Sequence, residues 1–522
     1  MPWKQFVMTL SLLLLAWTGP ASATLQLPKM FSDHMVLQRD TTLPVWGWAE
    51  PNATITVQIA GQNVSTTADE KGRWQVQLAP LRTSTTPLEL VVRAGQTTHT
   101  FRDVLVGDVW LCAGQSNMEF GVAGADNAAQ VLATATNSLI RLLRVQAPQA
   151  PTPVRDLPHG WTTSTAQYLK SFSAVGYFFG SRIHQETGIP IGLIGIGWGG
   201  TAIELWLRFE SLVDYPELAK FRENLEKKTA DFNKFSAELI EPMAAWVEQA
   251  RQARAQNEPL PVPPAVPPHP GLTQGLAGIY NGRVAPLVPF GMKGVLWYQG
   301  EANGDEDDIY FHKMRALIGG WRQAWNHNAL PFYFVQLANY QAATTNAAGG
   351  GPWTKLRMAQ LKSLQIPKTG MAVAIDIGDA SDIHPRNKVD VGHRLALWAL
   401  KHDYGQPALV CSGPLYKGVA VEGARIRVSF DHVGSGLIVG KKDGYGPARE
   451  VTGGILTRFA VAGSDRRWVW ADAVIDGATV LVSSPSVPAP VAVRYAFATN
   501  PAGCNLYNKE GLPAAPFRSD DW

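Results

Sequence analysis

Four short segments of the chain carry side chains suited to acyl transfer. They supply a hydroxyl, an imidazole, carboxylates, amides and glycines, and they span residues 114–119, 197–201, 299–303 and 382–385. A serine hydroxyl is a weak nucleophile until an imidazole takes its proton, and the imidazole needs an acceptor on its second ring nitrogen. These segments therefore predict acyl transfer with Ser116 as the nucleophile and His384 as its base.

Acyl transfer also requires N–H donors that face the developing oxyanion. We expect them among the backbone N–H groups of Ser116, Gly199 and Gly200 and the side-chain amides of Gln299 and Asn303. Each segment alone has an ordinary structural interpretation, because Gly-x-Ser is common in turns and glycines let chain segments pack closely. Their joint occurrence favours catalysis, since packing does not require four chemically complementary segments.

The elements that must position these residues are predicted to form a parallel α/β sheet with helices on both faces. Apolar runs of strand length occupy residues 104–113, 139–145, 191–196, 294–298, 332–338 and 371–377. Stretches of helical period alternate with them at residues 172–187, 309–325, 355–364 and 387–403. Ligands bind beyond the carboxyl ends of such strands, and the four segments follow four of these runs.

Shorter alternating segments separated by turn residues predict β-sandwich or jelly-roll-like parts on both sides, over residues 24–103 and 406–522. The α/β domain then covers residues 104–405. A helical and proline-rich insertion is expected at about 208–270, with a stiff polyproline return at residues 261–270. It could form a lid or wall of the site, or a peripheral decoration.

The N-terminus predicts export. Lys4 precedes an apolar stretch at residues 6–17, and Ala21-Ser22-Ala23 is typical of signal-peptidase cleavage after residue 23. We expect a periplasmic or extracellular protein without a membrane partner after this signal peptide is removed. The formal net charge is +3 and no Lys/Arg run occurs, which argues against a nucleic-acid partner. Among the three cysteines, Cys411 and Cys504 are the expected disulfide pair and Cys112 the free thiol.

The motifs together resemble the sialate O-acetylesterase family of carbohydrate esterases, in the SGNH-hydrolase superfamily. The resemblance rests on residues 107–118, 198–201, 279–282, 297–301 and 382–385. It implies a flavodoxin-like sheet, an acetylated carbohydrate substrate, Ser116 as nucleophile, His384 as base, and an oxyanion hole near Gly200 and residues 299–303. Oligomeric state stays open.

Two departures from the superfamily leave the acid of the triad open. The usual Asp three residues before the histidine is Ser381 here, and the usual Gly-x-Asn-Asp block is replaced by residues 299–303. Asp382 is the first choice for orienting His384, Glu301 is the second, and a backbone carbonyl is the third. Gln115, Asn117 and Trp198 are expected to contact substrate.

The glycan is also open. The family name implies 9-O-acetyl sialic acid, whose carboxylate would favour a bidentate arginine, with Arg386 or Arg283 as candidates. Neutral plant polysaccharides such as xyloglucan or xylan would instead need aromatic platforms and an open cleft. We lean slightly towards the sialate.

Other classes of protein fit the sequence less well. An α/β-hydrolase elbow needs glycine where Met118 stands. A glycosidase could use two carboxylates among Asp376, Asp379, Asp382 and Glu301, but it leaves Ser116 and His384 without a purpose. A metal site built on Asp376, Asp379, His384 and His393 lacks tight ligand spacing, so no metal or other cofactor is expected. A non-catalytic carbohydrate-binding protein is the alternative from another class.

Overall fold

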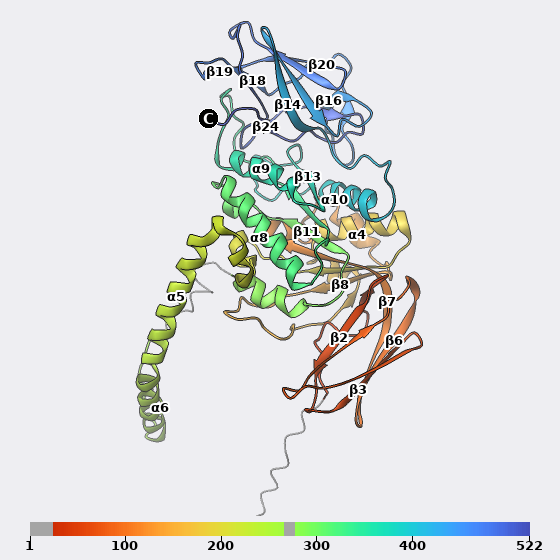
Figure 1. Ribbon diagram of the computed structural model, residues 1–522, viewed down its shortest axis with the longest axis vertical. Helices are drawn as coiled ribbons and strands as arrows, with labels where there is room; N and C mark the ends of the chain where they lie inside the picture. Colours follow the sequence, from red (N-terminus) through yellow and green to blue (C-terminus); the bar gives the residue numbers. More distant parts are fainter. Residues whose placement is uncertain (1–24, 266–276) are drawn as a thin grey trace, which may run out of the picture.

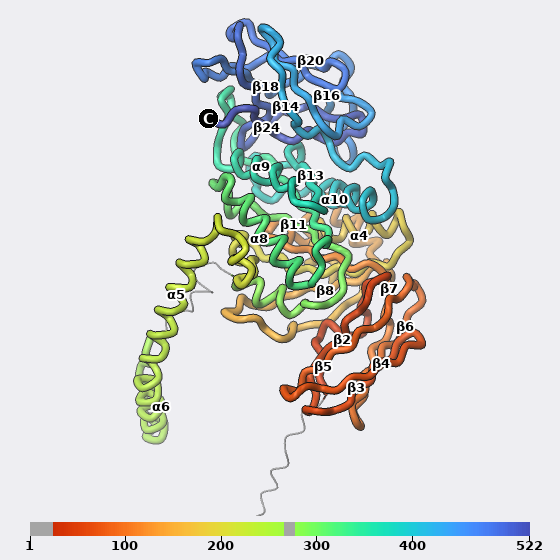
Figure 2. Tube along the Cα trace, in the orientation of Figure 1, coloured from red at the N-terminus to blue at the C-terminus, as the bar shows by residue number. Residues whose placement is uncertain are grey.

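The computed structural model describes residues 25–265 and 277–522. A central α/β part lies between two β-rich parts, the N-terminal one at one end of the molecule and the C-terminal one at the other (Figures 1 and 2). The proposed signal peptide, residues 1–23, lies outside the described residues. Within the described residues, no helix is long and apolar enough to cross a bilayer.

The central sheet has the strand order β13-β12-β11-β7-β10-β8, and these strands are parallel. Their bounds are Thr369–Val373, Phe332–Gln336, Gly294–Tyr298, Thr97–Gly114, Ile191–Gly195 and Ile140–Arg144. The short strand β9 (Thr162–Thr163) adds an antiparallel edge. All six expected strands form, but β13 ends at Val373, so residues 374–377 belong to the following loop rather than to the strand.

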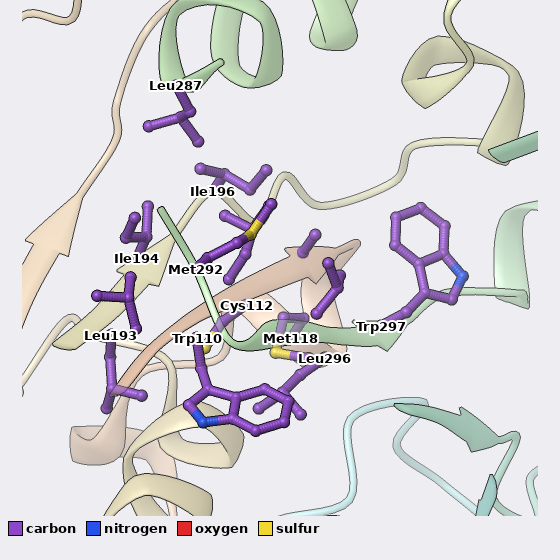
Figure 3. Close-up of a cluster of buried hydrophobic side chains, with 14 of the residues drawn as sticks. Trp110, Cys112, Met118, Leu193, Ile194, Ile196, Leu287, Met292, Leu296 and Trp297 are labelled. Atoms are coloured by element: carbon purple, nitrogen blue, oxygen red, sulfur yellow. The ribbon is translucent and has the colours of Figure 1, made fainter. Parts of the chain in front are cut away.

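Helices cover both faces of this sheet, as the sequence predicts. On one face lie α4 (Ala174–Thr187) and α10 (Lys388–Asp403), and on the other α8 (Asp308–Ala324) and α9 (Pro352–Lys362) (Figure 1). The ring of Trp110 packs 4.8 Å from Phe179 of α4, whereas Trp297 packs 6.3 Å from Trp321 of α8. Figure 3 shows Trp110 and Trp297 within the buried cluster that joins β7, β10 and β11. The two tryptophans thus anchor helices on opposite faces.

The flanking parts are β-rich. The N-terminal part pairs β3 (Thr54–Ile59) with β4 (Gln62–Thr67) and β6 (Ser84–Ala94), joins β6 and β1 (Val36–Gln38) to β7, and adds the pair β2 (Leu43–Trp48) and β5 (Arg73–Leu78). Strand β7 runs on into the central sheet, so one continuous strand connects the two parts.

The C-terminal part consists of three small antiparallel sheets. The first is formed by β14 (Leu415–Glu422), β15 (Arg425–Asp431), β21 (Thr479–Ser483) and β20 (Asp472–Asp476). The second is formed by β17 (Arg449–Glu450), β16 (Leu437–Lys441) and β23 (Leu506–Asn508), and the third by β19 (Trp468–Trp470), β18 (Phe459–Ala462), β22 (Ala492–Tyr495) and β24 (Phe517–Arg518). Its separate apolar core includes Val428, Val461 and Phe517.

The insertion is helical, as expected. Two short 3₁₀ turns, η3 (Phe209–Asp214) and η4 (Pro216–Leu218), lead into α5 (Ala219–Glu238) and α6 (Ile240–Ala255). These two helices project from the body as an arm (Figures 1 and 2), and neither contains a buried residue. Residues 261–265 of the proline-rich stretch form no helix or strand, and its remainder lies outside the described residues. The projection of the arm favours a peripheral position for α5 and α6 over a lid.

The expected disulfide is wrong, because Cys112, Cys411 and Cys504 are all free thiols. Cys411 lies near Lys401 and Tyr333, whereas Cys504 lies near Arg357 and Asp376. The two sulfurs therefore occupy different surroundings. Burial raises the pKa of Cys411 to about 11 and that of Cys504 to about 12, so neither forms a thiolate readily.

We predict that three thiols per chain react with a thiol reagent after denaturation without reductant. Burial should make the same thiols slow to react in the folded protein, because only an accessible sulfur in its thiolate form attacks the reagent. Absorbance titration measures both quantities. A count of one thiol in the denatured, unreduced protein would contradict this prediction and indicate a disulfide.

Candidate active site

The nucleophile sits on a tight turn at the carboxyl end of β7. Gly114 ends the strand with a φ of 136°, and a Cβ there would lie 2.1 Å from the Tyr298 carbonyl oxygen, so only glycine fits. The short helix α1 (Ser116–Glu119) follows directly. Met118 points into the buried cluster (Figure 3), while Ser116 is only half-buried. The turn thus holds Ser116 near the surface at the carboxyl end of the sheet.

The base reaches this turn from the loop after β13. His384 Nε2 lies 2.9 Å from Ser116 Oγ, which is hydrogen-bonding distance for proton transfer. On the other side of the ring, Nδ1 lies 3.3 Å from Asp382 Oδ1. The same carboxylate oxygen accepts the backbone N–H of His384 at 2.8 Å. Asp382 therefore stands where an orienting acid is needed.

Glu301 occupies a different place, behind the nucleophile. Its Oε1 accepts a hydrogen bond from Asn117 Nδ2, and its buried Oε2 has no hydrogen-bond partner among the described residues. Burial raises the pKa of Glu301, opposed by the Asn117 hydrogen bond and by the charges of Lys388 and His384. Glu301 is thus electrostatically close to the imidazole, whereas Asp382 is in contact with it.

Three of the five expected oxyanion donors are already engaged. The Gly199 N–H donates to Glu119 Oε2 at 2.7 Å. Gln299 Nε2 donates to Gln115, Thr201 and Asn303, and Asn303 Nδ2 donates to Glu204 and Glu306. Both amides are buried beneath the site because they satisfy other buried polar groups there.

The backbone N–H groups of Ser116 and Gly200 remain. Neither donates a hydrogen bond within the part of the chain that the structure describes. The Gly199–Gly200 segment approaches the nucleophile closely, since a Cβ on Gly199 would lie 3.3 Å from Ser116 Cβ. These two N–H groups can therefore donate to the oxyanion that forms on the acyl oxygen of a substrate attacked by Ser116 Oγ.

Three of the five expected substrate contacts are buried and make hydrogen bonds to other parts of the protein. Gln115 and Asn117 are buried, and Gln115 Oε1 accepts from the N–H groups of Gly300 and Ala302. Arg283 lies 4.1 Å from the centre of the half-exposed Trp198 ring. It donates to the carbonyls of Ala147, Ile196 and Gly197, and burial lowers its pKa to about 10.

Arg386, the second arginine expected to bind a substrate carboxylate, is exposed and lies two residues after His384. Its Nε donates to Asp126 Oδ1 at 3.0 Å. Within the described residues no group of three His, Cys, Asp or Glu side chains could hold a metal ion. The side chains of Ser116, His384 and Asp382 come together as the hydroxyl, imidazole and carboxylate that nucleophilic acyl transfer requires.

Sequence reasoning missed two residues of this neighbourhood. Glu119 fixes the Gly199 N–H, and Lys388 is a fully buried lysine that donates to Asn117 Oδ1. The signal for Lys388 is its place in the first turn of a helix, where a cation is disfavoured by the helix dipole. No signal in the sequence marks Glu119.

Comparisons with known proteins identify the family. A family described as "Carbohydrate esterase, sialic acid-specific acetylesterase" matches residues 106–233 and 282–401. Sialate O-acetylesterase from Mus musculus is 30% identical over 93% of this chain and 92% of its own length. This chain belongs to the sialate O-acetylesterase family. The Homo sapiens sialate O-acetylesterase is 29% identical and covers 98% of this chain and 96% of its own.

A solved structure extends the likeness to the whole fold. A carbohydrate acetylesterase from Xanthomonas citri is 37% identical, with a TM-score of 0.78 over 96% of this chain and 100% of that one. The fold of this sialate O-acetylesterase family member is therefore of the SGNH type, and the chain is a carboxylic ester hydrolase.

For this family member we predict that Asp382→Asn lowers kcat by roughly 10²-fold or more, because it removes the charge that contacts the imidazole. Glu301→Gln should cost less, since Gln keeps an oxygen that can accept from Asn117. Steady-state hydrolysis of 4-nitrophenyl acetate measures both variants. The reverse ranking would transfer the orienting role to Glu301.

Proposed function

We propose that the protein removes O-acetyl groups from carbohydrates by a Ser-His-Asp mechanism. The observation that carries the proposal is the 2.9 Å contact between Ser116 Oγ and His384 Nε2, with Asp382 beside Nδ1. Membership of a carbohydrate esterase family supports the ester substrate. A non-catalytic binding protein would have no use for this contact.

In the first half-reaction, Ser116 Oγ attacks the acetyl carbonyl carbon while His384 Nε2 takes the hydroxyl proton. The carbonyl oxygen becomes an oxyanion that faces the Ser116 and Gly200 N–H groups. The bond to the sugar oxygen then breaks, that oxygen receives the proton from His384, and acetyl-Ser116 remains. In the second half-reaction a water molecule gives a proton to His384 and attacks the acetyl carbon. The bond between that carbon and Ser116 Oγ then breaks, Oγ takes the proton back from His384, and acetate leaves.

Two glycan classes fit this mechanism. The names of the mouse and human relatives support an O-acetyl sialic acid. The placement of the arginines favours a neutral glycan, because Arg283 is used by three carbonyls and Arg386 is paired with Asp126. A sialate carboxylate would have to compete with Asp126 for Arg386.

The proposal includes export of the enzyme to the periplasm or the extracellular space. It rests on the leader-like residues 1–23, which place an apolar stretch before Ala21-Ser22-Ala23. Acetylated polysaccharides and cell-surface glycans are encountered outside the cytoplasm, which fits this location.

We predict that Ser116→Ala and His384→Ala each lower kcat at least about 10³-fold, because nucleophile and base act as a unit. Ser381→Ala is the matched control, since this serine lies on the same loop and bonds Asp379 rather than His384. Circular dichroism checks folding, and 4-nitrophenyl acetate reports activity. Near-normal turnover by either folded alanine variant of the pair would overturn the mechanism.

A second prediction concerns the substrate. Acetate should be released from at least one of 9-O-acetyl sialic acid, acetylated xyloglucan and acetylated xylan, and its release should survive a chelator because the nucleophile and base need no metal. Acetate measured enzymatically across this panel ranks the glycans. No release from any of them would defeat the carbohydrate-esterase proposal.

A further inference from the structure

Lys388 is a fully buried lysine directly beneath the reacting residues. It is the first residue of α10, four positions after His384, and its side chain runs towards the nucleophile turn. Its Nζ donates to Asn117 Oδ1 at 2.5 Å. The same Nζ lies 4.8 Å from the ring centre of Phe120 and 5.5 Å from that of Tyr298. Proton transfer in the proposed mechanism does not use this ammonium.

Asn117 connects the two halves of the proton relay. It follows Ser116 in the chain, and its Nδ2 donates to the carbonyl oxygen of Ile383 at 3.0 Å. Ile383 in turn precedes His384. The second acceptor of Nδ2 is Glu301 Oε1. One side-chain amide thus ties the turn of the nucleophile to the loop of the base.

An asparagine amide is almost symmetric in shape, so its partners decide which way it points. Asn117 has acceptors, Ile383 and Glu301, on its Nδ2 side. A donor on the Oδ1 side fixes this orientation, and Lys388 is that donor. Without it, Oδ1 would be a buried acceptor without a partner, and the amide could turn away from Ile383.

We propose that Lys388 is a positioning residue that fixes the Asn117 amide and thereby holds the His384 loop against the Ser116 turn. The inference rests on the proposed esterase function. Lys388 acts through Asn117 and does not touch the acetyl group.

The charge of Lys388 adds a measurable signature. The charged and titratable groups around it are Glu301, Asp382 and Tyr298, and His384 faces Glu301. Burial lowers the pKa of Lys388 to about 7, against the opposing effect of the two carboxylates. Removing this cation leaves the negative charges of Glu301 and Asp382 without the positive charge that opposes them. The rising limb of kcat/KM against pH should then move to higher pH.

The test compares Lys388→Met with Lys401→Met, a lysine at the other end of α10 that bonds the Pro407 and Leu409 carbonyls. Lys388→Met should lower kcat roughly 10²-fold, as expected when a reacting group is displaced by about 1 Å, with little change in KM. It should also shift the rising limb. Lys401→Met should change thermal stability only, and Lys388→Arg should keep the limb in its wild-type position.

A double-mutant cycle tests whether Lys388 acts through Asn117. Asn117→Ala should lose activity similarly, and the double variant should lose no more than Asn117→Ala alone. A folded Lys388→Met variant with the kcat and pH profile of the wild type would overturn the inference, and so would additive losses in the double variant. Neither result affects the esterase proposal as long as the wild-type enzyme is active. If Lys388→Met does not fold, wild-type kcat in Asn117→Ala overturns it. An inactive wild-type protein would defeat both proposals.

Discussion

The proposed mechanism depends on one contact between distant parts of the chain, the hydrogen bond between Ser116 and His384. Ser116 follows the central strand β7, whereas His384 follows the edge strand β13, with β11 and β12 between them. Three strand spacings of about 4.8 Å separate β7 from β13 by roughly 14 Å. The loop of the base must therefore cross the carboxyl end of the sheet. It is tethered on the way, because Gly378 N donates to Asn339 Oδ1 after β12 and Asn117 holds Ile383.

Buried amides at the strand ends support this crossing. Gln115, Gln299 and Asn303 meet at the ends of β7 and β11, where the sheet stops supplying backbone partners. Lys313 and Glu204 complete this network, and Lys313 bridges Glu204 and Glu306. A buried polar group without a partner is costly, so these side chains bond one another. Gln299 and Asn303 follow a parallel strand, as catalytic residues do, and this is why the sequence suggests a catalytic role for them.

The sequence was sufficient for the fold class, the six parallel strands, the crossover helices and the meeting of Ser116 with His384. Each follows from local periodicity or from the rule that active sites lie beyond parallel strands. It was not sufficient for the hydrogen-bond partners of Gly199, Gln299 and Arg283, because most of these partners come from distant segments. The same holds for Lys388, whose acceptor Asn117 lies 271 residues away. The disulfide prediction failed because cysteine count alone does not give proximity.

The C-terminal β-rich part supports the base at both ends of its loop. Where the loop begins, Asp376 pairs with Arg394 of α10 and accepts a hydrogen bond from Tyr507 of β23. Beyond its end, Asp390 pairs with Lys442 and accepts the Gly446 N–H. The fully buried Arg357 of α9 donates to the carbonyls of Ala498 and Thr499, which joins the sheet edge to the same part. An edge strand has a neighbouring strand on only one side. The loop that follows it therefore needs this external support to keep His384 within hydrogen-bonding distance of Ser116.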